Sequence, residues 1–418
     1  MMESRPDRGD LLPVYQPGGM CGRWAVLLVF IGALGCDRGP DSFPVNRVFA
    51  RNQKLARTLD EFDTPRVTVL LKDIDRVVTR YFGVPGDPLM PSCEGVELGP
   101  LFALADLRHA AGFVEQEAGH VEPGLYRDLC VRCHGTSGDG SGRLARGLNP
   151  YPRDYRRGIF KFKRTPSTLP PTDADLHGVL LRGIPETAMP SFRDLSPSQR
   201  GALVQYVRYL SIRGLFERAV MMEVAITFDD DDRLLDPKQQ EVSPTAYARQ
   251  VEMLDAILNE VVQPWLDVDE QMADVPPVPA DYDAPQSTAR GRELFFTTLT
   301  NCGTCHGNTG FGDGQTEDYD DWAKELEPAN PEALADYLAL GALPPRYAEP
   351  RNLRLGTYRG GDRPEDLFVK FKNGIAGTTM TSVATQLTDH DIWCLVSYAR
   401  FLPRDPVFRE ERGAESRE

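Results

Sequence analysis

The feature that most constrains this chain is a five-residue motif that occurs twice. Residues 130–134 read Cys-Val-Arg-Cys-His, and residues 302–306 read Cys-Gly-Thr-Cys-His. The whole chain of 418 residues has only 8 cysteines and 6 histidines. At that composition about 0.002 matches to Cys-x-x-Cys-His are expected by chance, so the repetition indicates a specific chemistry. The residues concerned are Cys130, Cys133, His134, Cys302, Cys305 and His306.

The spacing within the motif suits a flat, iron-bearing macrocycle. Cysteines three residues apart lie on one face of a helical turn, so both thiols reach one edge of the ring. There they can add across the two vinyl groups of haem b, while the histidine offers its imidazole to the iron. A zinc site needs wider ligand spacing than Cys133 and His134 allow, and a thioredoxin-like dithiol needs strands on both sides. The motifs therefore predict two covalently attached c-type haems.

Composition predicts a globular chain and argues against some partners. With 41% hydrophobic and 26% charged residues, the sequence is typical of a soluble globular protein and long enough for two or three domains. The net charge of −15 argues against nucleic acid or an anionic membrane surface as a partner. An acidic surface suits a basic protein partner, and it is equally compatible with simple solvation.

The N-terminal region is typical of an export signal. Residues 24–34 (WAVLLVFIGAL) form an apolar run preceded by a basic residue. The run is shorter than the roughly 20 residues that span a bilayer, but it suits the core of a signal peptide. Because residues before Met20 contain no comparable run, either Met1 or Met20 can be the true start.

The end of this run resembles a bacterial lipoprotein box. It reads Ala33-Leu-Gly-Cys36, so residues 1–35 are expected to be cleaved and Cys36 to carry lipid. Ala33 and Leu34 depart from the usual box, and an ordinary secretory signal is the alternative. We expect an exported protein on the periplasmic face of a bacterial membrane, held there by a lipid anchor.

Similarity between the two halves of the chain continues beyond the motifs and predicts two modules of one kind. The corresponding segments are Pro152-Arg-Asp-Tyr-Arg156 and Pro350-Arg-Asn-Leu-Arg354, Asp175-Leu176 and Asp366-Leu367, residues 183–189 and 374–380, and residues 202–210 and 394–402. The third pair ends in Met189 and Met380, and the spacing from aspartate to methionine is the same in both copies.

These residues resemble the cytochrome c family, over residues 120–214 and 288–404. The resemblance implies an all-α fold of two tandem cytochrome c-like modules, in each of which the first and last helices cross beside the haem. It implies His134 and His306 as fifth iron ligands and Met189 and Met380 as sixth. A thioether suits iron, although core filling is the commonest role of methionine. The carbonyl groups of Pro152 and Pro350, or of Pro150 in the first copy, are the implied acceptors for the free histidine N–H.

The predicted organisation has six parts: residues 1–35 signal peptide, 36–117 N-terminal extension, 118–216 first module, 217–286 helical connector and linker, 287–406 second module, and 407–418 charged tail. Residues 66–82 are amphipathic and predict a helix. His134 and Pro152 are 18 residues apart but His306 and Pro350 are 44 apart, so the second module has 26 additional residues. They are acidic and predict a lid or docking element, or else a neutral insertion. Cys93 and Cys394 have no assigned chemistry.

Two irons with two protein ligands each predict an electron carrier rather than an enzyme. We expect single electrons to pass between respiratory partners, such as a quinol-oxidising complex, a terminal oxidase or a soluble cytochrome. The alternative is an enzyme similar to di-haem cytochrome c peroxidases, in which one haem is open to peroxide. A well-placed methionine in each module favours the carrier.

Overall fold

The computed structural model describes residues 42–115, 121–229, 231–315 and 317–405. Helices dominate these residues, and the named strands form two short antiparallel hairpins, so the predicted all-α class is confirmed. Within these ranges no helix has the length and apolar character needed to cross a bilayer. The predicted signal, Cys36 and the charged tail from residue 407 lie outside the described residues.

The N-terminal extension is a helical layer built around one amphipathic helix. Its elements are α1 (Arg47–Asn52), η1 (Asp60–Asp63), α2 (Pro65–Phe82), β1 (Gly83–Val84), β2 (Asp87–Pro88), α3 (Leu104–Ala111), β3 (Phe113–Glu115) and β4 (Val121–Pro123). Helix α2 begins with Pro65 at its first position and ends where Gly83 adopts a φ of +70°. Its buried face recurs at helical spacing through Val67, Leu70 and Ile74, which confirms the helix predicted over residues 66–82.

The first module contains a long final helix that continues into the connector. The module's elements are α4 (Leu125–Leu129), α5 (Val131–His134), η3 (Ala145–Gly147), η4 (Tyr155–Arg157), α6 (Asp173–Arg182) and α7 (Pro197–Thr227). A capping box between Ser196 and Gln199 starts α7. The helix is buried on most sides, and even its Arg213 and Glu217 side chains, which pair with each other, are only 2% exposed.

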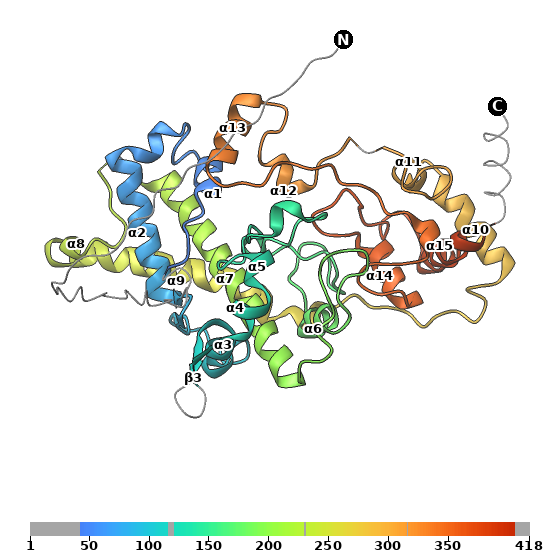
Figure 1. The fold of residues 1–418 in the computed structure, drawn as a ribbon, viewed down its shortest axis with the longest axis horizontal. Helices are drawn as coiled ribbons and strands as arrows, with labels where there is room; N and C mark the ends of the chain where they lie inside the picture. The colour runs from blue at the N-terminus through green and yellow to red at the C-terminus, as the bar shows by residue number, and fades with distance from the viewer. Residues whose placement is uncertain (1–41, 116–120, 230, 316, 406–418) are drawn as a thin grey trace, which may run out of the picture. The chain divides into compact units, whose positions relative to one another are not determined.

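The connector returns along the same side as the extension. Its elements are α8 (Pro237–Val242), α9 (Pro244–Leu266) and η5 (Val268–Gln271). Figure 1 shows α2, α7 and α9 next to one another, and residues from all three share one hydrophobic core with the first module. The extension, first module and connector therefore form one packed body.

The second module has its own core. Its elements are α10 (Pro285–Phe296), α11 (Cys302–His306), α12 (Asp321–Lys324), α13 (Pro331–Ala339), η6 (Leu353–Leu355), α14 (Pro364–Asn373), α15 (Asp389–Phe401) and η7 (Leu402–Arg404). The first and last helices, α10 and α15, cross closely, because Gly291 has no side chain to collide with the backbone of Cys394. Phe295, Trp393 and Tyr398 lie in this core.

Two observations bear on the predicted domain boundaries, which stay predictions. Helix α7 runs unbroken through residue 216, so the first module and the connector share one helix. Helix α3 packs against α7 much as α10 packs against α15, although α3 precedes the predicted module start at residue 118. The hairpin β3–β4 separates α3 from the short α4, which is why the sequence pattern did not join them.

Candidate haem sites

Each Cys-x-x-Cys-His motif folds as the short helical turn that its chemistry requires. In α5 the backbone N–H of His134 donates to the carbonyl of Cys130 at 2.8 Å, which places both cysteines on one side of the turn. None of the described cysteines forms a disulfide. Burial raises the pKa of Cys130 to about 12 and also raises the pKa of Cys302 and Cys305. These groups are therefore neutral thiols in the apoprotein, unlike the thiolates of reactive or zinc-bound cysteines.

The two histidines are held in one tautomer by backbone carbonyl groups. Nδ1 of His134 lies 3.1 Å from the carbonyl oxygen of Arg153, and Nδ1 of His306 lies 3.0 Å from that of Arg351. Because a carbonyl only accepts, Nδ1 carries the proton and Nε2 keeps a lone pair for a metal. Burial lowers the pKa of His134 to about 4 and also lowers that of His306, so both rings are neutral.

The acceptor carbonyls correct the prediction of Pro152 and Pro350. In both modules the acceptor belongs to the next residue, an arginine. The proline carbonyls point instead at Gly140 and Gly312, where a side chain would collide with them. Successive carbonyls of an extended backbone point in opposite directions, so the one that reaches the imidazole is one residue further along.

The methionine loops share one hydrogen-bond pattern. A threonine two residues before each methionine accepts from the methionine N–H and donates to an isoleucine carbonyl, and the isoleucine N–H donates to the methionine carbonyl. The residues are Ile184, Thr187 and Met189 in the first module, with distances of 2.8–3.1 Å, and Ile375, Thr378 and Met380 in the second, with distances of 2.7–3.2 Å. Thr187 and Thr378 were not predicted as site residues, although the repeated Ile-x-x-Thr-x-Met spacing carried the signal.

The repeated aspartates Asp175 and Asp366 also have a structural role. Each occupies the third position of a helix, α6 or α14, and its carboxylate accepts from the N–H of the N-cap residue. These capping boxes fix where the helix before each methionine loop begins. The constant spacing from aspartate to methionine thus reflects a shared helix-and-loop unit.

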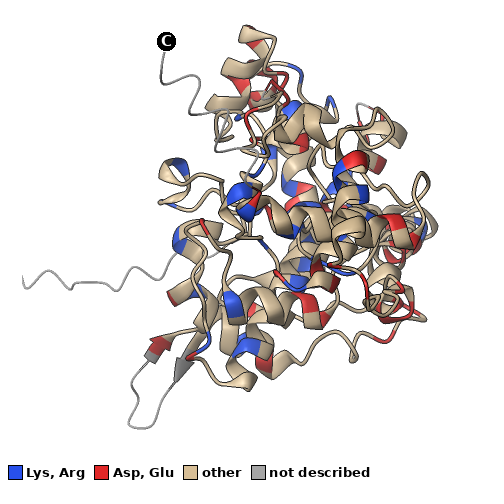
Figure 2. Ribbon diagram, turned by 90° about the vertical axis from the view of Figure 1, so that its right-hand side faces the viewer, with Lys and Arg blue, Asp and Glu red and all other residues tan. Residues whose placement is uncertain are grey.

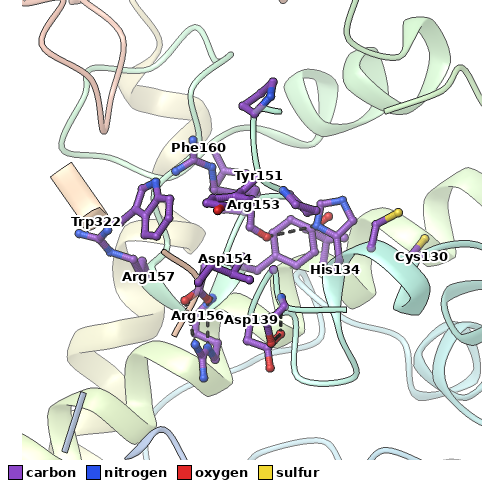
Figure 3. Close-up of a pocket in the computed structure, with 18 of the residues that line it drawn as sticks. Cys130, His134, Asp139, Tyr151, Arg153, Asp154, Arg156, Arg157, Phe160 and Trp322 are labelled. Carbon is purple, nitrogen blue, oxygen red and sulfur yellow. Dashed lines mark hydrogen bonds and ion pairs between the residues drawn. The ribbon is translucent and has the colours of Figure 1, made fainter. Parts of the chain in front are cut away.

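A cavity of about 510 Å³ joins the predicted ligands of the first module. Cys130, Cys133, His134 and Met189 all line it, and Figure 3 shows His134 close to Cys130. Its walls include the aliphatic and aromatic residues Leu176, Val179, Leu180, Leu203, Val204, Val207, Phe160 and Phe192. The volume lies in the range of roughly 300–1,000 Å³ found for cofactor sites.

The residues present in the first module fit a haem. The apolar walls suit the faces of the ring, the two thiols suit its vinyl edge, and the basic side chains of Arg153 and Lys161 suit its propionates. Tyr155 stacks on the His134 ring with centroids 4.7 Å apart and planes 15° apart, which further fixes the imidazole. No group of three or more His, Cys, Asp or Glu side chains in the described residues could hold a bare metal ion.

Part of the cavity wall comes from the additional residues of the second module. Asp320, Trp322 and Glu325 line the cavity of the first module. Glu325 pairs with Arg157 at 2.8 Å, and the Trp322 ring contacts the ring of Tyr151 with centroids 5.6 Å apart. In Figure 3 Trp322 and Cys130 lie on opposite sides of the labelled residues. Residues 320–325 thus line a part of the cavity that lies away from Cys130.

The fold and these two sites are those of a protein that binds two covalent haems. Residues 288–402 match the family described as cytochrome c, and residues 123–207 match the family described as cytochrome c oxidase, cbb3-type, subunit III. Two cytochrome c domains therefore lie at separate regions of this chain, which is the arrangement of a di-haem c-type cytochrome, and the domains imply two covalently bound c-type haems.

A chain from the reducing HAO-like protein complex of Kuenenia stuttgartiensis is 23% identical, with a TM-score of 0.44 over 66% of this chain and 93% of that chain. No curated protein matches the sequence.

Proposed function

We propose that this protein passes single electrons between respiratory partners through two haems with histidine and methionine ligands. The observation that carries this proposal is that both modules present the same pair of groups: an imidazole in a fixed tautomer and a methionine on a hydrogen-bonded loop. A bound haem supplies an iron that alternates between ferric and ferrous states. The protein holds both ligands in place, so neither state requires rearrangement.

The two matching methionine loops favour a carrier over a peroxidase. A peroxidase needs one iron with an open position for peroxide, which would leave one module without a sixth ligand. Here the loops of Met189 and Met380 have the same internal hydrogen bonds, including the threonine that orients the methionine N–H.

The spin state of the two haems tests this proposal. In the purified full-length protein we expect two low-spin, six-coordinate irons, each with the weak far-red band of sulfur bound to ferric iron, and negligible consumption of peroxide. Magnetic circular dichroism and electron paramagnetic resonance measure this directly. A high-spin haem in the resting protein, together with rapid peroxide turnover, would replace the carrier with the peroxidase.

We further propose that the chain is exported and held at a membrane by lipid on Cys36. The apolar run of residues 24–34 and the Gly35-Cys36 pair support this proposal. Two or three acyl chains give lasting attachment, whereas one would be marginal. Cys36→Ser should release haem-loaded protein into the soluble fraction. Retention of that variant on salt-washed membranes, in cells without its redox partners, would refute lipid anchoring.

The proposed partners are a quinol-oxidising complex or soluble cytochrome as donor and a terminal oxidase as acceptor. The match of the first module to a subunit of a terminal oxidase supports this placement. In isolated membranes both haems should be reduced by quinol and reoxidised by oxygen, and cyanide should block only the reoxidation. Reoxidation that is insensitive to cyanide would exclude a haem–copper oxidase as acceptor.

A further inference from the structure

Four basic side chains meet where the first module contacts the second. Arg153 and Lys161 come from the first module, and Arg351 and Arg359 occupy the corresponding positions in the second. We refer to these four residues as the cation cluster. The chain as a whole has a net charge of −15, and acidic and basic residues are otherwise interspersed along the described elements (Figure 2). A local excess of positive charge is therefore not a product of composition.

Arg153 and Arg351 occupy the same position in the two repeats, and each contacts both modules. The carbonyl of Arg351 accepts from the iron-ligand candidate His306, while its guanidinium pairs with Glu186, at 2.5 Å, on the loop of Met189. Arg153 is placed in the mirrored way. Its carbonyl accepts from His134, and its guanidinium lies beside Gly377, on the loop of Met380.

The second pair of cations also crosses between the modules. Lys161 contacts Asp320 of the second module at 3.2 Å, and Arg359 donates to the carbonyl of Glu186 at 3.2 Å. Arg153, Lys161 and Arg359 all line the cavity of the first module. The second module therefore supplies one basic side chain, that of Arg359, to this cavity.

The cation cluster has more positive than negative charge. Glu186 and Asp320 are the carboxylates that form ion pairs with its members among the described residues. The Nε atoms of Arg351 and Arg359 are buried and have no hydrogen-bond partner. Burial, together with nearby cations, lowers the pKa of Lys161 and of Arg359. Buried charge is costly unless it is paired, so this region is suited to an additional anionic group.

The haem carboxylates are anions of the required kind. We propose that the cation cluster is a carboxylate-binding site shared by the two modules, which neutralises haem propionates and couples the reduction potentials of the two haems. This inference rests on two covalent haems, as the proposed function does, but it does not depend on which partners exchange electrons.

The test removes one cation from one module and measures the potential of the haem in the other. Arg359→Gln removes a cation of the second module, and Lys161→Gln removes one of the first. Spectroelectrochemical titration of the full-length, haem-loaded protein gives two midpoint potentials. Met189→Ala and Met380→Ala assign each potential to its module, because each variant lowers one of them. Arg290→Gln is the matched control, since Arg290 is half-exposed and pairs outside the cation cluster with Glu293 and Asp391.

We expect Arg359→Gln to lower both potentials, because a nearby cation stabilises the more electron-rich ferrous state. The expected change is about tenfold in each reduction equilibrium, which is 59 mV for one electron. Lys161→Gln should act likewise, and Arg290→Gln should change neither potential by as much as twofold. Arg359→Lys keeps the charge and should restore both potentials.

Two results would overturn the shared site. One is a shift confined to the haem of the substituted module, which would mean that each module neutralises its own haem. The other is an equal shift in Arg359→Gln and Arg359→Lys, which would mean that packing and not charge is responsible. The far-red band, measured on every variant, shows whether methionine ligation is retained. Failure of the carrier proposal would appear separately, as a high-spin haem in the wild-type protein.

Discussion

The close approach of Gly140 to the carbonyl of Pro152, which leaves no room for a side chain, allows the strictest test of how the first site is built. Gly140 has a φ of +74°, and a Cβ added there would lie 2.5 Å from that carbonyl oxygen. Gly140→Ala therefore adds two costs. Left-handed backbone costs about 1–2 kcal/mol for a residue with a Cβ, and forcing an atom into a packed site costs about 1–3 kcal/mol more. We expect a loss of about 3 kcal/mol in the free energy of unfolding of the packed body that contains the first module.

Two further glycines separate these costs. Gly95 has a φ of +82° but no atom within 4 Å of an added Cβ, so Gly95→Ala measures the backbone strain alone. Gly147 has neither a positive φ nor a close neighbour, so Gly147→Ala should be nearly neutral. Equilibrium urea unfolding followed by far-UV circular dichroism gives the three free energies. Gly140→Ala should lose about 1–3 kcal/mol more than Gly95→Ala.

The same substitution should also disturb the iron ligands. Arg153, whose carbonyl orients His134, directly follows Pro152, so displacing one carbonyl moves the other. Gly140→Ala should weaken the far-red sulfur band of the first haem, which contributes about half of the total, and Gly95→Ala should leave it intact. Equal stability losses in Gly140→Ala and Gly95→Ala would refute the collision. A large loss with an unchanged band would refute the link to His134.

Three other predictions concern separate parts of the molecule. Met189→Ala and Met380→Ala should each remove about half of the far-red band, admit small ligands such as cyanide or carbon monoxide to one iron and lower one potential, which absorption spectroscopy and titration would show. Burial lowers the pKa of Lys370 to about 8, below the 10.5 of an unhindered lysine, so the unfolded chain binds this proton more tightly than the folded chain does. The free energy of unfolding in urea should therefore rise between pH 8 and about 10.5. Lys370→Met should flatten that rise. Arg213→Met leaves the buried Glu217 carboxylate without its cation and should cost about 3–5 kcal/mol. A double variant that also has Glu217→Gln removes the negative charge but keeps an acceptor for the N–H of Asn46, and it should recover most of that loss if the buried charge is responsible.

Local patterns in the sequence predicted the parts of each site that lie close together along the chain. The spacing of Cys-x-x-Cys-His specified a helical turn, and the repeated segments that end in Met189 and Met380 specified two copies of one loop. The acceptor for His134 was one residue away from the prediction, because the repeat marks the proline but the direction of each carbonyl depends on Gly140.

Contacts between distant segments could not be predicted in this way. The packing of Trp322 against Tyr151 and the pairing of Arg351 with Glu186 join residues far apart in the chain, and no periodicity links them. The sequence predicted a helical connector after residue 216, but it did not predict that one unbroken helix, α7, joins the connector to the first module, since the apolar residues of α7 face several neighbours and give no single stripe.

The length of α7 has a consequence for the order in which the chain matures. Residues of the extension, such as Phe82, pack against Tyr209 and Phe216 of this helix, so the extension cannot complete its core until α7 has been synthesised. The motif at residues 130–134 emerges before that point. In the finished fold Cys130 is only 9% exposed, which leaves little room for an enzyme to reach it. Cys130 belongs to the same buried cluster as Leu203 and Tyr206 of α7, so its thiol cannot be fully enclosed until this later helix has been synthesised.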